Sequence, residues 1–186
     1  LMVNLESLNM LDLDYRMIEL FRHPVDTLYS WWKGGWGKRF SNDPRAFSLT
    51  LVYNNELVPW YCAGHEEEWL PLNPMERCLH TGLDIIQRLV KQYQKAGSPD
   101  YIHILTFEDF LEQPNEELAK ICSFLGTATT DLTQHFIHKQ RCPQVLDIKG
   151  RERKLDEFKN SVSAELLDKL VTMSKEYETN LYGLKK

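Results

Sequence analysis

The chain has 186 residues, of which 42% are hydrophobic and 26% charged, and its formal net charge is −5. These values are typical of a globular protein with a sizeable core, and the acidic balance argues against wholesale wrapping of nucleic acid while leaving room for a local basic pocket. The longest apolar runs are far too short to cross a bilayer. We therefore expect one domain over residues 1–186, with no nucleic-acid partner and no membrane span.

The N-terminal segment begins "LMVNLESLNML", with neither a signal peptide nor an initiator methionine, as though the chain were entered within a longer protein. The short run 15–21 ends at Arg22, and its brevity predicts a strand. Pro24 suits the first turn of a helix, which the glycines of "KGGWG" would end. One face of this helix is apolar and the other polar. The apolar face holds Val25, Leu28 and Trp32, and the polar face holds Asp26, Ser30 and Lys33.

Residues 38–72 contain three prolines, which predicts irregular structure. A strong helix is expected next, with Asn73 as its cap, Pro74 in its first turn and Gly97 at its end. Its apolar stripe predicts one buried face. That stripe consists of Met75, Leu79, Gly82, Ile86, Leu89 and Tyr93.

The run 101–107 is the clearest strand, because it is short, apolar and preceded by the turn signal "GSPD". A polar turn, "EDFLEQP", is expected after it, and then a helix over 114–126 with Leu118, Ile121, Cys122 and Leu125 facing inward. Residues 127–162 have a mixed and partly basic composition. A last helix is expected from Ser163 to Tyr182. Two strands that are each followed by a helix predict an α/β domain with a parallel sheet.

The cysteines show neither a CxxC pair nor metal-ligand spacing, so no metal site is predicted. Cys78 and Cys122 lie in amphipathic patterns that predict buried thiols, and a pairing of Cys62 with Cys142 stays open. The acidic stretch "HEEEW" at 65–69 lacks the spacing of a two-histidine zinc helix, which favours a solvated turn.

Three further histidines and two tryptophans have simple interpretations. His103 alternates into a strand and is expected as a core residue with its hydrogen bonds satisfied, while His135 and His138 are expected at the surface. Periodicity predicts that Trp32 lies in the core. Trp36, which lies between glycines, is the tryptophan that we expect to contact a bound acceptor molecule.

Arg22 and Ser30 stand where a strand gives way to a helix, and ligands of parallel α/β sheets bind at such junctions. A phosphate there could take a forked pair of hydrogen bonds from the arginine and one from the serine hydroxyl, with the helix N-terminus adding its dipole. On spacing alone, a capping arginine beside an incidental surface serine is the simpler interpretation.

Three sequence blocks change that interpretation. "RHPVDTLYS" resembles the 3′-phosphate-binding motif of PAPS-dependent sulfotransferases, in which proline follows arginine by two residues and serine follows it by eight. "ILTFEDFLEQPNEELAKICSFLG" is similar to the family's second strand-turn-helix block. "RERKLDEFKN" is similar to its C-terminal element, in which an arginine precedes an aromatic-Lys-Asn triplet by seven residues. The blocks occur in the family's order, and the chain is identified as a member.

The resemblance implies a P-loop-NTPase-like three-layer α/β fold and the transfer of a sulfuryl group from PAPS (3′-phosphoadenylyl sulfate) to an acceptor hydroxyl or amine, without a metal. It implies that Arg22 and Ser30 hold the 3′-phosphate, that Arg151 closes on the same phosphate, and that Phe107 lies near the adenine. The family usually has tyrosine at the position of Phe107, and Arg-Lys-Gly where this chain has Arg-Glu-Arg at 151–153.

The family's 5′-phosphosulfate loop and its catalytic base are not found in these residues. We therefore expect a single partial domain over 1–186 that lacks the first strand and this loop and is inactive alone, with no catalytic residue assigned. The acceptor would be a carbohydrate, towards which the resemblance leans, or a small molecule, in the cytoplasm or the Golgi lumen. The alternatives are a non-catalytic nucleotide-binding or interaction module and a nucleotide-kinase relative.

Overall fold

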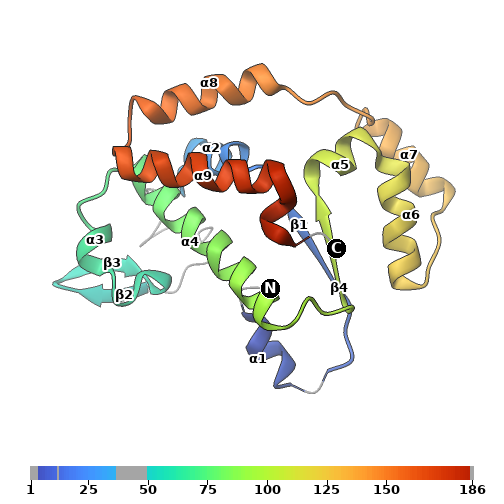
Figure 1. Ribbon diagram of the computed structural model, residues 1–186, viewed down its shortest axis with the longest axis horizontal. Helices are drawn as coiled ribbons and strands as arrows, with labels where there is room; N and C mark the ends of the chain where they lie inside the picture. Colours follow the sequence, from blue (N-terminus) through green and yellow to red (C-terminus); the bar gives the residue numbers. More distant parts are fainter. Residues whose placement is uncertain (1–3, 12, 37–49, 185–186) are drawn as a thin grey trace. The chain divides into compact units, whose positions relative to one another are not determined.

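The computed structural model describes residues 4–11, 13–36 and 50–184, and Figure 1 follows their elements along the chain. The chain divides into two compact units. The first unit comprises residues 1–23, 88–148 and 178–186, and the second comprises residues 24–87 and 149–177. The single partial domain expected from the sequence stays a prediction.

The first unit is built around two parallel strands that lie side by side, β1 (Met17–Phe21) and β4 (Ile102–Thr106) (Figure 1). Met17 pairs with Ile102 and Phe21 with Thr106, and Met17, Phe21 and Ile102 are buried. This confirms both predicted strands and the parallel sheet, which has two strands in the described residues. The helical elements that lie wholly within this unit are α1 (Leu5–Asn9), α5 (Phe107–Glu112), α6 (Pro114–Leu125), α7 (Asp131–Lys139) and the short turn η5 (Leu181–Gly183).

The segment after β4 differs from the expected polar turn. It forms helix α5, because the Thr106 hydroxyl caps the new helix by accepting a hydrogen bond from the Asp109 backbone N–H at 3.0 Å. Helix α6 begins at Pro114 and ends at Gly126, whose φ of 69° is left-handed, as predicted. The inward face predicted for α6 is wrong at Leu125, which is exposed. Glu117, which was not predicted to face inward, is buried.

The mixed segment 127–162 contains two helices that the sequence analysis did not predict, α7 and α8 (Ile148–Lys159). Helix α7 starts from a capping box in which Thr133 takes the place of the usual glutamate or glutamine, a weaker sequence signal. His135 and His138 on α7 are exposed, as predicted.

The second unit contains α2 (Pro24–Lys33), α8, and most of α4 (Pro74–Lys95) and α9 (Ala164–Asn180), with the smaller elements β2 (Thr50–Tyr53), β3 (Glu56–Pro59), η4 (Trp60–Cys62) and α3 (Glu66–Trp69). Helix α4 begins as predicted, since the Asn73 Oδ1 accepts the backbone N–H groups of Met75 at 2.9 Å and Glu76 at 3.0 Å. In the middle of α4, Gly82 faces Leu28 of α2 so closely that a Cβ atom would lie 2.0 Å from Leu28 Cδ2.

The prediction of irregular structure over 38–72 is wrong between residues 50 and 69, while residues 38–49 lie outside the described residues. Strands β2 and β3 form an antiparallel hairpin that turns at Asn54 and Asn55, with φ values of 48° and 66°. A two-residue turn with both φ values positive is favoured by asparagine, so the "NN" pair was the overlooked signal. Trp69 packs with Val58 and Cys62 in a small core beneath the hairpin.

Three other expectations can be compared with the structure. None of the four cysteines forms a disulfide in the described part of the chain, so Cys62 and Cys142 are not paired. Asp26, expected on the polar face of α2, is buried. Of the helices that the structure describes, none has the length and apolar character needed to span a membrane.

Candidate functional site

The carboxyl edge of the parallel pair brings together two of the predicted site residues. Phe21 and Thr106 are register partners, so the residues that follow them, Arg22 and Phe107, leave the sheet at the same edge. The Arg22 guanidinium lies over the Phe107 ring, 4.7 Å from its centroid. This cation–π contact holds an exposed arginine head next to an aromatic face.

A second contact ties the same two segments together. The backbone N–H of His23 donates to Glu108 Oε1 at 3.0 Å, so the residue after Arg22 is bonded to the residue after Phe107. The buried His23 ring places Nε2 3.0 Å from Glu178 Oε1 near the end of α9. His23, Glu108 and Glu178 therefore brace the edge from which Arg22 projects. Sequence analysis did not identify Glu108 or Glu178 as part of the site.

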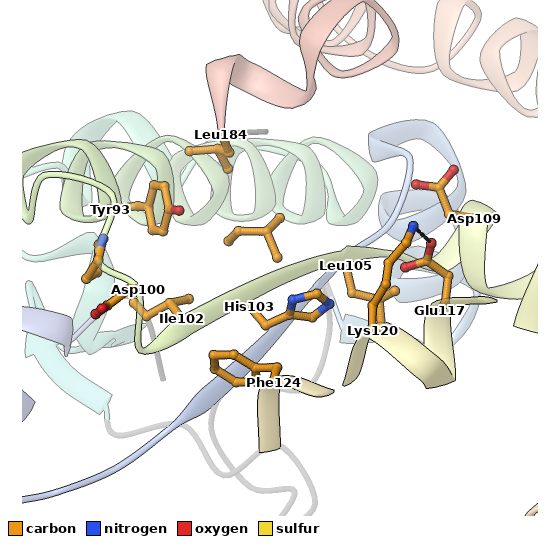
Figure 2. Close-up of a pocket in the computed structure, with 12 residues that line it drawn as sticks. Tyr93, Asp100, Ile102, His103, Leu105, Asp109, Glu117, Lys120, Phe124 and Leu184 are labelled. Carbon is orange, nitrogen blue, oxygen red and sulfur yellow. Dashed lines mark hydrogen bonds and ion pairs between the residues drawn. The ribbon is translucent and has the colours of Figure 1, made fainter. Parts of the chain in front are cut away.

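A cavity of about 440 Å³ lies beside β4 in the same unit. Figure 2 shows Lys120, Glu117 and Asp109 at one end of it, and Asp100 at the other. Lys120 Nζ pairs with Glu117, and the lining as a whole carries three carboxylates and one ammonium group. Because this excess of negative charge repels phosphate, the cavity is a poor candidate for binding a nucleotide's phosphates.

His103 lies in the wall of this cavity, with its ring centroid 5.4 Å from that of Phe124 (Figure 2). Its Nε2 atom is buried and has no hydrogen-bond partner among the described residues. The prediction of a core histidine with its hydrogen bonds satisfied is therefore wrong. One neighbour of the ring is Phe124, whose aromatic side chain offers no hydrogen-bonding group to this nitrogen.

The second unit contains a compact charge cluster between α2 and α8. Arg151 Nε donates to Asp26 Oδ2 at 2.9 Å, and Lys154 Nζ donates to Asp26 Oδ1 at 2.6 Å. Burial alone would raise the pKa of Asp26, but the hydrogen bonds and charges of Lys154 and Arg151 outweigh it and hold that pKa below its ordinary value. The carboxylate therefore stays ionised, and the three groups together carry a charge of +1.

Ser30 stands one helical turn after Asp26 on α2 and is exposed, so the two residues are neighbours on the helix surface. Arg151, the other residue expected at the phosphate, lies on α8 and forms an ion pair with Asp26 of α2. Arg22 and Phe107 are therefore in contact in the first unit, whereas Ser30 and Arg151 in the second unit are each neighbours of Asp26.

The sequence analysis missed Asp26 and Lys154 as members of this group. A signal was available, since Arg151 and Lys154 are three residues apart and Asp26 and Ser30 are four apart, spacings that place each pair on one helix face. Trp36, which was associated with an acceptor, stacks on Trp31 with ring centroids 5.4 Å apart, and its role stays a prediction.

Comparison with known proteins gives one match. The family model of the sulfotransferase domain matches residues 1–161, which includes β1, β4 and α8. Searches of curated proteins and of solved structures gave no significant match. Within the described residues, no group of three or more His, Cys, Asp or Glu side chains is arranged to hold a metal ion. The family match covers most of the chain, which belongs to the sulfotransferase domain family.

Proposed function

We propose that the protein transfers a sulfuryl group from PAPS to a hydroxyl or amine of a carbohydrate or small-molecule acceptor. The observation that carries this proposal is the pairing of Arg22 with Phe107 at the carboxyl edge of β1 and β4, where parallel sheets bind their ligands. A P-loop-like three-layer arrangement is part of the proposal, since β1 and β4 are parallel and each is followed by a helix.

The side chains present fit a nucleotide that carries a 3′-phosphate. Arg22 is exposed and offers a planar fork that matches phosphate geometry, and Ser30 offers an exposed hydroxyl. Arg151 and Lys154 keep a net charge of +1 after pairing with Asp26. The Phe107 ring offers an apolar face to the adenine, without the hydroxyl that a tyrosine would add.

Each residue has a defined task in this proposal. When bound, PAPS supplies the sulfuryl group, and adenosine 3′,5′-bisphosphate is the product that remains. Arg22 and Ser30 donate hydrogen bonds to the 3′-phosphate and so fix the orientation of the nucleotide. Arg151 adds positive charge to the same phosphate from α8, and Phe107 limits the movement of the base. The catalytic base and the groups that bind the 5′-phosphosulfate are not assigned to residues of this chain.

The family match supports this function over the two alternatives, a nucleotide kinase and a non-catalytic module, because the matched domain is that of a sulfotransferase. The alternatives also predict different ligand preferences. A nucleotide kinase would favour a 5′-polyphosphate, whereas the 3′-phosphate role that the family resemblance gives to Arg22 and Ser30 predicts a preference for a phosphate on the ribose 3′ position.

Isothermal calorimetry with three nucleotides tests the proposal. Adenosine 3′,5′-bisphosphate is expected to bind at least about tenfold more tightly than 5′-AMP, because only its 3′-phosphate gains charge-assisted hydrogen bonds. Adenosine 5′-diphosphate is the control, since it also carries two phosphates but places both at the 5′ position. Equal affinity for the bisphosphate and 5′-AMP, or a preference for the diphosphate, would overturn the proposal.

A further inference from the structure

The ion cluster between α2 and α8 is more buried than ordinary surface salt bridges. The side chains of Asp26, Arg151 and Lys154 are 11%, 17% and 27% exposed. One carboxylate receives a hydrogen bond from a different cation on each of its two oxygens. Arg151 and Lys154 lie three residues apart on α8 and repel each other, so the carboxylate is what makes their close approach favourable.

The docking of α8 on α2 also has support that does not involve Asp26. The Tyr29 hydroxyl donates to Glu157 Oε1 at 2.8 Å, and Lys33 Nζ lies 3.5 Å from Glu157 Oε2. The Tyr29 ring meets the buried Phe158 ring edge-on, with centroids 6.0 Å apart. Because these contacts hold the two helices together, the cluster at Asp26 is not needed merely to attach α8.

The cluster also leaves positive charge next to Ser30. Its two cations exceed its one carboxylate by a charge of +1, and Ser30 stands one turn along α2 from Asp26. The Lys154 ammonium carries three N–H donors, and its contact with Asp26 is a single hydrogen bond. An anionic group beside Ser30 would therefore find a hydroxyl and a partly neutralised pair of cations.

We propose that Asp26 is a positioning residue that presents Arg151 and Lys154 as one paired-cation site, and that Lys154 binds the same nucleotide phosphate as Ser30. This inference rests on the proposed function and adds a binding residue, Lys154, to which the sequence analysis gave no role. A purely structural cluster would change the stability of the fold when altered but would leave the nucleotide preference unchanged.

The test measures the affinities for adenosine 3′,5′-bisphosphate and 5′-AMP by calorimetry at several salt concentrations. Lys154→Gln is expected to weaken bisphosphate binding by about tenfold, to leave 5′-AMP binding unchanged and to make bisphosphate affinity less dependent on salt. The matched control is Lys149→Gln, which removes the same charge from an exposed position on the same helix. It should behave as the unaltered protein does in all three respects.

Asp26→Asn and Asp26→Glu test the positioning role. Asp26→Asn should also reduce the preference for the bisphosphate, although Arg151 and Lys154 are both intact, and Asp26→Glu should restore part of it. If Asp26→Asn does not fold, Lys154→Gln and Asp26→Glu still decide the outcome. An unchanged bisphosphate preference in Lys154→Gln, in a protein that discriminates between the nucleotides, overturns this inference alone. An unaltered protein that does not discriminate between them overturns the proposed function and this inference with it.

Discussion

Replacing Arg22 separates a ligand-binding role from a structural one. In the structure Arg22 is exposed, and its contact with Phe107 at 4.7 Å is of a kind that contributes about 0.5–1 kcal/mol at exposed sites. A charge-assisted fork to phosphate contributes more, so Arg22→Ala should weaken binding of adenosine 3′,5′-bisphosphate by about 2–3 kcal/mol, on the order of a hundredfold. Loss of the Phe107 contact by itself lowers the melting temperature without ligand by about 2–4 °C in a chain of this size.

The assay pairs calorimetry of the bisphosphate with a thermal melt of the protein alone. Arg22→Lys should recover only part of the affinity, because an ammonium group cannot reproduce the bidentate geometry of the guanidinium. Phe107→Leu keeps an apolar side chain but removes the ring, and is the control for the cation–π contact. If Arg22→Ala lowers the melting temperature steeply while the affinity is intact, Arg22 is a structural cap and the reasoning is refuted.

Three further predictions concern stability and are measured by urea unfolding. Gly82→Ala should destabilise the protein by about 1–3 kcal/mol, because the new methyl group would overlap the buried Leu28 side chain; a stabilised variant would contradict this. Asn73→Ala should cost about 1–2 kcal/mol, because the cap of α4 loses two hydrogen bonds; an unchanged unfolding midpoint would argue against that cap. Burial, with a smaller effect of Lys169, lowers the pKa of His80, so the folded state resists its protonation. The folded protein should therefore lose stability as the pH falls below the ordinary histidine pKa of about 6.5. His80→Gln should reduce this loss of stability, and an equal loss in the variant would exclude His80 as the source of the pH dependence.

The parts of the fold that were predicted correctly are those with local signals. Pro24 and Pro74 mark helix starts, Gly126 marks a helix end, and the short apolar runs before Arg22 and Phe107 are strands. The hairpin at Asn54 and Asn55 was missed because its strands are only four residues long and the "NN" turn signal between them was overlooked. Short elements of this kind depend on packing against a core, here Val58 on Trp69, which no local window shows.

The candidate site shows the same division between local and distant information. The approach of Arg22 to Phe107 follows from two parallel strands that end in register, which the strand predictions together implied. The burial of Asp26 could not be predicted from α2 alone, because its partners Arg151 and Lys154 are 125 and 128 residues away in the sequence. The unsatisfied Nε2 of His103 likewise depends on what α6 places opposite β4.

Phosphorus NMR of bound adenosine 3′,5′-bisphosphate tests the central claim most directly, because it reports on the two phosphates separately. At saturating protein, the 3′-phosphate resonance should shift from its position in the free nucleotide. Arg22→Ala and Ser30→Ala, each at saturation, should move that resonance back towards its free position and leave the 5′-phosphate resonance where it is in the unaltered complex. A 3′-phosphate resonance that neither substitution moves would contradict the assignment of these residues to the 3′-phosphate.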